Sequence, residues 1–273
     1  MTGGRIAGAV RPWSDIWSRS GWTVQAHIMT GQARTLDLNG KLRASGSEAA
    51  CLSYAELSAP PSRARRAVVL LHGLANYPGE TARAARAFQH NGWAVANTGY
   101  PSLRAPIARH AESASRVARS LADGGAETVS FFGHSLGGLV ARAAMARAAA
   151  DGWRPGRLLL VGSPAQGSAI ARLAVRSRAL RALGGECVDA VTPAGAGAIP
   201  LPVCQDTMII AGGTGGRGYN PLLRGDNDGV VTVDETRLPG HEADFLLVRA
   251  LHTSLPSRPE TIAAALRFLD AGR

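Results

Sequence analysis

The sequence is poor in cysteine and lysine, and it has no long hydrophobic run. Among its 273 residues there are 3 cysteines, Cys51, Cys187 and Cys204. An odd number of cysteines without a C-x-x-C pair argues against a disulfide framework and against a zinc site, although one bridge between Cys187 and Cys204 stays open. No apolar run approaches the ~18 residues of a membrane-spanning helix, so we expect no membrane span.

Aromatic residues are also scarce, at 5%, and the positive charge comes nearly all from arginine. The net charge is +10, and Lys41 is the only lysine. The arginines are scattered at helical spacing, as in "ARLAVRSRALRALGG", and are not interleaved with aromatics as in a nucleic-acid-binding surface. We therefore expect solvated helix faces and no nucleic-acid partner, while a weak attraction to anionic surfaces stays open.

The N-terminal region carries no recognisable targeting signal. Arg5 and Arg11 flank only the short apolar stretch "IAGAV", and no cleavage signature follows. A cytoplasmic location is the expectation. No internal repeat or long linker divides the chain, so a single domain over 1–273 is expected, with a less regular segment at 1–65.

From about residue 66 onward, strand-like and helix-like runs alternate. Continuous apolar strands between helices predict an α/β fold, in which a mainly parallel sheet is covered by helices on both faces. Strands are predicted at 67–73, 93–100, 128–132, 157–164, 206–213 and 244–250, and helices at 80–92, 106–125, 136–152, 167–185 and 259–272.

The stretch "TVSFFGHSLGGLV" contains the pattern G-x-S-x-G around Ser135. A β-branched and aromatic run precedes the pattern, and a run rich in Ala, Leu and Arg follows it, which is the strand–turn–helix setting of a serine nucleophile. Gly133 and Gly137 fit this setting because larger side chains would collide across a sharp turn. Ser135 is therefore the candidate nucleophile.

Such a serine needs a histidine base and an acid that orients the histidine. On this kind of turn the chain order is serine, acid, histidine, which leaves His241 and His252. His252 follows the predicted strand at 244–250 and so lies at the carboxyl end of the sheet, on the side of Ser135, whereas His241 precedes that strand. Asp226 and Asp228 are both candidates for the acid, and Asp228 is favoured because a tight turn and an apolar pair follow it.

The oxyanion that forms in acyl transfer needs two backbone N–H donors. One is predicted at Leu136, after the nucleophile, and the other at Leu74 in "HGLAN", with Gly73 giving the backbone room. His72 is expected to brace this loop.

Two further patterns fail on their context. "GTGGRG" at 213–218 fits a dinucleotide fingerprint, but Pro221 interrupts the helix that should follow. "RGDNDGVVTVDE" resembles a calcium loop, yet Arg224 stands where the first ligand should be, which leaves only a weak structural cation open. No cofactor and no metal site are therefore expected.

Five ordered stretches, "LLHGL", "FGHSLGG", "GSPAQGS", "NDGVV" and "LHTSL", resemble those of bacterial esterases and lipases of the α/β-hydrolase fold, and "YPS" resembles the small lipase-like members. The resemblance covers 66–270. It implies a mostly parallel sheet of about eight strands and a Ser135/Asp228/His252 triad.

A serine carboxylesterase or lipase-like hydrolase that works through an acyl-enzyme is therefore the expected function. An amidase or thioesterase with the same triad stays an alternative, as does a non-catalytic binding protein on this fold. The segment 163–205, expected to form a short cap, is rich in Gly, Pro and Ala after its first helix. This is poor material for a second helix that could close as a lid, and without large aromatics it offers little apolar surface to bury an extended acyl chain. We therefore expect an open site that prefers short to medium acyl chains of small-molecule or lipid esters.

Overall fold

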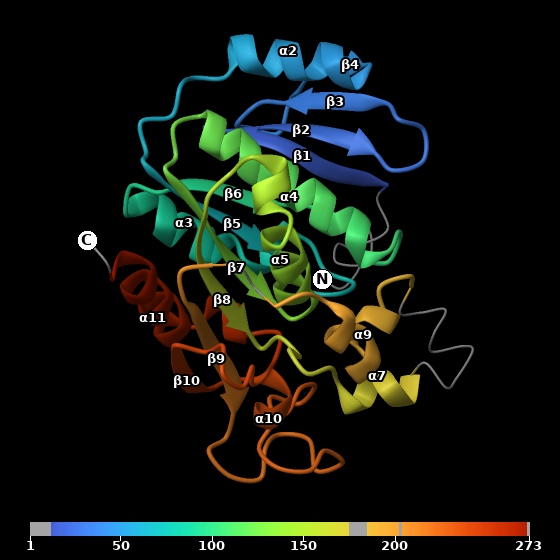
Figure 1. Cartoon of the computed structure of the whole chain (residues 1–273), viewed down its shortest axis with the longest axis vertical. Helices are drawn as coiled ribbons and strands as arrows, with labels where there is room; N and C mark the ends of the chain where they lie inside the picture. Colours follow the sequence, from blue (N-terminus) through green and yellow to red (C-terminus); the bar gives the residue numbers. More distant parts are fainter. Residues whose placement is uncertain (1–11, 175–184, 202–203, 272–273) are drawn as a thin grey trace.

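The chain forms two β-sheets, the larger of which is covered by helices on both faces (Figure 1). The computed structural model describes residues 12–174, 185–201 and 204–271. Within these residues the larger sheet has six strands, all parallel, in the spatial order β6-β5-β7-β8-β9-β10. They are β5 (Arg66–Leu71), β6 (Ala94–Thr98), β7 (Thr128–His134), β8 (Pro155–Val161), β9 (Thr207–Gly213) and β10 (Asp244–Arg249).

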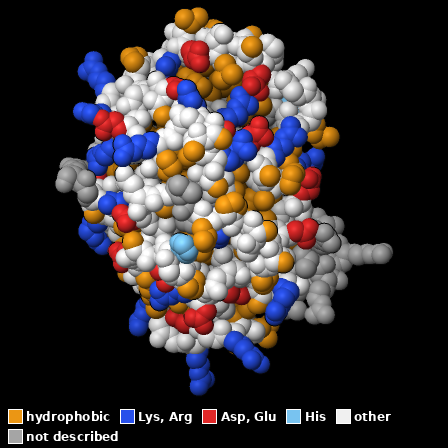
Figure 2. Space-filling model, in the orientation of Figure 1, with side chains coloured by type: hydrophobic (Ala, Val, Ile, Leu, Met, Phe, Trp, Pro, Cys, Tyr) orange, Lys and Arg blue, Asp and Glu red, His pale blue; other side chains and the backbone are white. Residues whose placement is uncertain are grey.

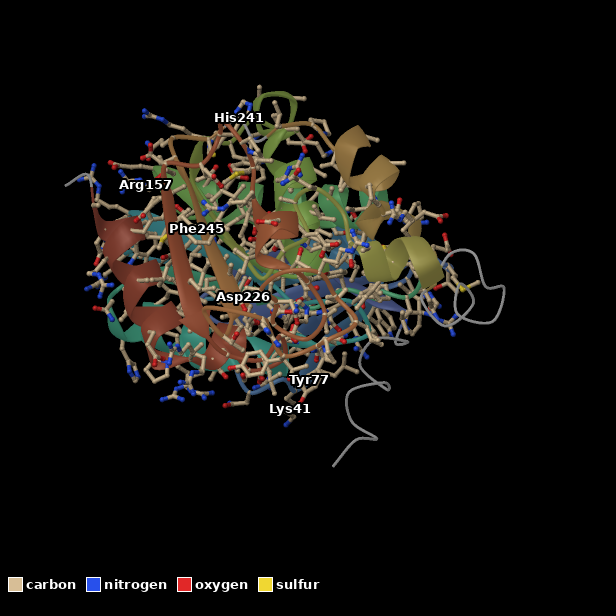
Figure 3. The ribbon with its side chains drawn as sticks, turned by 90° about the horizontal axis from the view of Figure 1, so that it is seen from below. Lys41, Tyr77, Arg157, Asp226, His241 and Phe245 are labelled. Atoms are coloured by element: carbon tan, nitrogen blue, oxygen red, sulfur yellow. The ribbon has the colours of Figure 1, made fainter. Side chains whose placement is uncertain are left out.

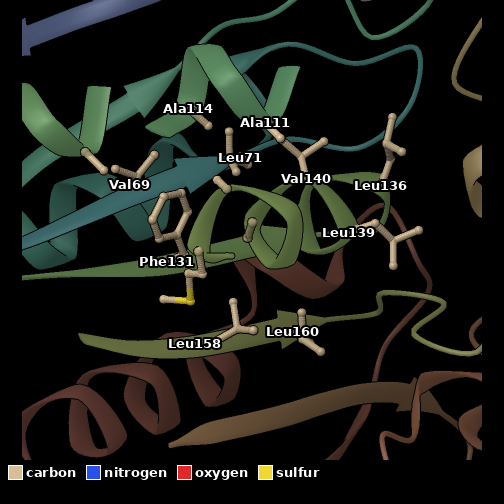
Figure 4. Packing of buried hydrophobic residues seen from close by; sticks show 14 of the residues in the cluster. Val69, Leu71, Ala111, Ala114, Phe131, Leu136, Leu139, Val140, Leu158 and Leu160 are labelled. Carbon is tan, nitrogen blue, oxygen red and sulfur yellow. The ribbon is translucent and has the colours of Figure 1, made fainter. Parts of the chain in front are cut away.

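The central strands are apolar along their length because helices cover both faces of the sheet. Along β5, Val69 and Leu71 point into one hydrophobic cluster, and Val68 and Leu70 into the other. Figure 4 shows the first cluster, where Phe131 of β7 packs beside Val69. The helices over this face are α4 (Ile107–Asp123) and α5 (Leu136–Met145), and those over the other face are α3 (Ala82–His90) and α11 (Pro259–Asp270).

The predicted alternation of strands and helices from residue 66 onward is confirmed. One predicted helix, at 136–152, is divided into α5 and the short α6 (Ala148–Asp151), which ends at Gly152 in the left-handed conformation. The predicted helix at 167–185 begins as α7 (Ala169–Ala174), and its remainder at 175–184 lies outside the described residues.

The N-terminal segment is more regular than its sequence suggests. It forms an antiparallel sheet of β1 (Trp13–Arg19), β2 (Trp22–His27), β3 (Ala33–Leu36) and β4 (Leu42–Gly46), followed by α2 (Glu48–Ser58). Period-two burial is not general here, because β1 packs on α4 and is buried along most of its length, whereas β4 at the edge is largely exposed.

This antiparallel sheet meets the larger sheet at its β6 edge. The backbone N–H of Asp15 donates to the carbonyl of Gly99 at 2.9 Å, and the Asp15 carboxylate accepts the Gly99 N–H at 2.6 Å. Burial raises the pKa of Asp15 to about 6, against the opposing effect of these hydrogen bonds. The mostly parallel arrangement is confirmed, but the expected count of about eight strands is slightly too high, because this sheet has six and β1–β4 form a separate antiparallel sheet.

All three cysteines are free thiols, so Cys187 and Cys204 are not bridged. Within the described residues, the helices are all too short or too polar to cross a bilayer.

Candidate active site

Ser135 lies at the turn between β7 and α5, in a strained backbone conformation. Its φ of 54° and ψ of −124° are unusual for a residue with a side chain. The turn is tight, because a Cβ at Gly137 would collide with the carbonyl oxygen of Leu71. The backbone N–H of Ser135 donates to the carbonyl of Val161 at 3.0 Å, which fixes the turn to β8. The half-buried Ser135 side chain is thus held at the carboxyl end of the sheet.

His252 and Asp228 form a buried pair at the same end of the sheet. Nδ1 of His252 lies 2.7 Å from Oδ2 of Asp228. Because a carboxylate only accepts, Nδ1 carries the proton and Nε2 is left to accept one. The other oxygen of Asp228 accepts the backbone N–H groups of Val230 at 3.0 Å and Val231 at 2.8 Å. The ring of His252 is thus oriented by a carboxylate that is itself fixed.

Asp226, the less favoured candidate for the acid, and His241 make other contacts. Both oxygens of Asp226 accept backbone N–H groups, from Thr214 and Gly215 at 2.8 Å each, so this carboxylate holds the loop that follows β9. Burial acts to raise the pKa of Asp226, but these hydrogen bonds lower it overall. His241 is exposed and precedes β10, and Figure 3 shows it well apart from Asp226.

Ser135 and His252 open into one cavity of about 330 Å³. Its walls are mostly aliphatic, as expected of a site that takes an apolar group. No hydrogen bond joins the side chains of Ser135 and His252 among the described contacts, an arrangement that often tightens only around a substrate. The lining includes Leu74, Pro164, Ile170, Ala171, Val188, Val191, Val230 and Val231.

The loop after β5 passes directly over Ser135. A Cβ at Gly73 would lie 3.2 Å from Cβ of Ser135, so glycine permits this close approach. Leu74 lines the cavity, and Ala75 has a positive φ of 56°, with its N–H held by Oγ of Ser102 at 3.0 Å. Leu136 begins α5, where the first N–H groups have no intrahelical acceptor. The backbone amides of Leu74 and Leu136 thus belong to two segments that border Ser135.

Glu80 was not singled out by the sequence, yet its carboxylate organises this loop. Glu80 ends the short turn of helix η1 (Pro78–Glu80), and its side chain is only 4% exposed. Oε2 accepts the Gly73 N–H at 2.7 Å and lies 2.9 Å from Nδ1 of His134, and Oε1 accepts from the side chain of Asn76. Burial acts to raise the pKa of Glu80, but the His134 ring and these donors lower it overall.

His134 connects Glu80 to the triad histidine. Its Nε2 lies 3.1 Å from the carbonyl oxygen of His252, and the two imidazole rings are 4.7 Å apart. His134 precedes the serine in the motif, and its place in the chain excluded it as the base, so its bridging position was also missed by the sequence. No sequence pattern would have shown that it faces a buried carboxylate.

His72 lies under the loop and away from the cavity lining. Its Nδ1 donates to the carbonyl of Gly73 at 2.9 Å, and its ring stacks on Tyr100 with 4.3 Å between centroids. Burial lowers the pKa of His72 to about 4. These contacts are those of a bracing residue.

The segment at 163–205 contributes more to the site than expected. A short second helix is present, because Pro193–Ala198 forms α9, with Thr192 as N-cap and Pro193 in its first turn. The segment also supplies aliphatic lining to the cavity, through Ile170, Val188 and Val191.

A buried arginine attaches this segment to α5. The guanidinium of Arg142 donates to the carbonyls of Ala165 at 3.0 Å and Ile199 at 2.9 Å, and burial lowers its pKa. These bonds fix both ends of the cap against the helix that follows Ser135.

The calcium-like stretch serves other purposes in the fold. Glu235 forms a capping box with Thr232 at the start of α10 (Val233–Thr236) and also accepts the Ala169 N–H at 2.6 Å. Within 12–174, 185–201 and 204–271, no three His, Cys, Asp or Glu side chains gather as metal ligands would.

The parallel sheet covered by helices on both faces has the arrangement of the α/β-hydrolase fold. Solved structures bear out this fold at low sequence identity. Lipase BlEst2 of Bacillus licheniformis, in its mature form, superposes with a TM-score of 0.61 at 18% identity, over 77% of this chain and 94% of that chain. A metagenomic carboxyl esterase superposes with a TM-score of 0.54 at 19% identity, over 78% of this chain and 77% of that chain. Phospholipase PlaB of Legionella pneumophila superposes with a TM-score of 0.56 at 17% identity, over 76% of this chain and 59% of that chain.

No protein-family model matches the chain, and no curated protein matches it by sequence.

Proposed function

We propose that the protein is a serine hydrolase that cleaves carboxylic esters of short to medium acyl chains through an acyl-enzyme intermediate. The observation that carries the proposal is the buried Asp228–His252 pair, whose histidine lines one apolar cavity together with the strained Ser135. A serine hydroxyl, an oriented imidazole and a carboxylate are the groups that acyl transfer needs.

In this mechanism the Ser135 hydroxyl attacks the ester carbonyl while Nε2 of His252 takes its proton. The Leu74 and Leu136 amides donate to the oxyanion of the tetrahedral intermediate. His252 then gives the proton to the leaving alcohol, and a water molecule hydrolyses the acyl-enzyme by the same route. Asp228 keeps the proton on Nδ1 of His252 throughout, and it stabilises the imidazolium that forms.

The acyl preference is supported by the size and lining of the cavity. About 330 Å³ lies at the small end of ligand pockets, which run from about 300 to 1,000 Å³. Its aliphatic walls favour an alkyl chain over a charged group. The solved neighbours named as a lipase, a carboxyl esterase and a phospholipase agree with an ester as the scissile bond.

The nucleophile is tested with a fluorophosphonate probe and a panel of matched esters, thioesters and amides. Ser135→Ala should abolish labelling and lower kcat by roughly 10³-fold or more. Ser168→Ala is the matched control, because Ser168 lines the same cavity and should leave labelling intact. Residual activity above about a tenth of the parent in Ser135→Ala would exclude this nucleophile, since triad serines contribute far more. Faster turnover of the thioester or the amide than of the matched ester would assign the protein to thioesterases or amidases instead.

A further inference from the structure

The loop at 214–230, between β9 and α10, lies at the lower end of the molecule in Figure 1. It leaves several apolar side chains exposed. Leu222 is 90% exposed, and Tyr219 and Val230 are 42% and 40% exposed. A single exposed leucine is ordinary on a protein surface. Here three apolar side chains are exposed on one loop, and one of them, Val230, also lines the cavity.

The loop is clamped from inside by Asn227, which is fully buried. Its side-chain oxygen accepts the backbone N–H groups of Asn220 at 2.9 Å and Gly229 at 3.0 Å. Its amide group donates to the carbonyls of Asn220 at 3.1 Å and Gly225 at 3.0 Å. Asn220 in turn accepts the N–H of Leu222 at 3.0 Å. Leu222 is therefore held outward by a hydrogen-bonded turn that fixes its backbone.

The exposed charge around this turn is positive. Arg217 and Arg224 are exposed in the loop, and Arg249 is exposed at the end of β10, where its guanidinium approaches Gly215. The acids of the loop, Asp226 and Asp228, are both engaged in internal hydrogen bonds. The next exposed acid along the chain is Asp234, in α10. Figure 2 shows basic side chains projecting from this lower end of the molecule.

The same loop borders the mouth of the cavity. Val230 lines the cavity beside Ser135. A Cβ at Gly229 would lie 3.6 Å from Leu251 and 4.0 Å from Tyr219, so these two exposed side chains flank the turn that carries Asp228. Leu251 itself is 50% exposed and directly precedes His252. The loop that carries Leu222 is therefore bordered by Leu251, the residue before His252, and it contributes Val230 to the cavity lining.

From this arrangement we propose that the loop at 214–230 docks the protein on an anionic lipid surface, with Leu222 entering the apolar layer and Arg217 and Arg224 contacting phosphate groups. An apolar tip flanked by cations matches the boundary between acyl chains and anionic headgroups. A nucleic acid would match the arginines but not the leucine tip. The proposal rests on the proposed ester hydrolysis in one respect, since it presents lipid esters to the cavity.

Binding of the full chain to vesicles tests the proposal. Phosphatidylcholine vesicles are compared with vesicles that contain about 30% phosphatidylglycerol, which supplies the anionic surface. The parent should sediment with the anionic vesicles and much less with the neutral ones. Leu222→Ser should weaken this partitioning about tenfold, the effect of withdrawing one large apolar side chain from the membrane. Arg224→Glu should weaken it at least as much.

The matched control is Leu57→Ser, because Leu57 in α2 is 89% exposed and lies far from the cavity lining. It should bind within about twofold of the parent, since it carries the same loss of exposed apolar area. Neither leucine variant should change kcat on a water-soluble short ester. Failure of the parent to bind anionic vesicles, equal losses in both leucine variants, or equal binding to neutral vesicles would each overturn the proposal.

The two proposals fail separately. Ser135→Ala should bind vesicles as the parent does, whether or not it hydrolyses esters. Retained hydrolysis by Ser135→Ala would refute the assigned nucleophile and leave the docking result standing.

Discussion

Oε2 of Glu80 accepts a hydrogen bond from the backbone N–H of Gly73 at 2.7 Å, one residue before the Leu74 amide. The same oxygen lies 2.9 Å from Nδ1 of His134, and Nε2 of His134 lies 3.1 Å from the carbonyl oxygen of His252. One buried carboxylate thus connects the loop over Ser135 to the segment that carries the histidine.

Glu80→Gln should lower kcat by about 10- to 100-fold with KM within about threefold, because small displacements of an oxyanion donor are costly in the transition state. The amide N–H of Gln would face a donor at Gly73 or Asn76. Steady-state kinetics on a soluble ester provide the measurement. Asp37→Asn is the control, since Asp37 is also buried and accepts backbone N–H groups, at Asn39 and Lys41, within the N-terminal sheet. An equal kcat loss in both variants would mean that Glu80 acts only through stability.

Asp228→Asn should lower kcat by about 10³- to 10⁴-fold, because an amide favours the wrong tautomer of His252. Asp226→Asn should cost less than about tenfold, because Asp226 holds the loop at Thr214 and Gly215 and does not contact the imidazole. Both variants are compared by kcat with substrate at saturation. The reverse ranking would transfer the role of acid to Asp226.

Gly137→Ala should destabilise the fold by about 1–3 kcal/mol or more, because the new Cβ would collide with the Leu71 carbonyl in rigid backbone. Gly197→Ala is the matched control. Gly197 lies in α9 with nothing within 4 Å of an added Cβ, and alanine there should be neutral or stabilising by about 0.5–1 kcal/mol. Urea unfolding of the two variants measures the difference in free energy of unfolding. Equal stabilities would show that the turn at Ser135 can move far enough to accommodate a Cβ at residue 137.

Acid should destabilise the protein through His110, which is buried in α4. Burial first, and then the nearby His72, lower the pKa of His110 from 6.5 to about 4. The folded pKa is below the unfolded value, so this stabilisation is present above about pH 6.5 and is lost as the pH falls toward 4. The shift corresponds to at most about 3 kcal/mol.

The measurement is the free energy of unfolding in urea between pH 8 and pH 4.5, a range chosen to cover about two units on either side of the histidine titration. His110→Gln should make the free energy of unfolding depend less steeply on pH. His90→Gln, at an exposed position of α3, should leave the slope of free energy against pH unchanged. An unchanged slope in His110→Gln would contradict the lowered pKa.

Much of the candidate site was predictable from local sequence. Runs of β-branched residues, glycines and alanines predict the strand–turn–helix around Ser135. The parallel sheet follows from apolar strands that alternate with helices along the chain. The choice of His252 over His241 required only the rule that one end of a parallel sheet carries the site. The choice of Asp228 over Asp226 rested on the turn after it, and the structure places the Asp228 carboxylate 2.7 Å from His252.

Other features depended on contacts between distant segments. The N-terminal strands show weak alternation, and their pairing beside β6 is made through Asp15 and Gly99, 84 positions apart in the chain. The short helix α9 forms because Thr192 and Pro193 cap it, although its glycines have low helix propensity.

The sequence by itself determined the order of the elements, the serine turn and the order of the candidate triad, because periodicity, glycine placement and chain order act over short distances. Only the tertiary structure decided that Glu80 faces Gly73 and His134, and that Leu222 is left exposed on the loop that contributes Val230 to the cavity lining. Whether a carboxylate is buried among donors, or a leucine is left in water, depends on how segments pack in space. That packing is a collective result of the whole core, and no local pattern records it.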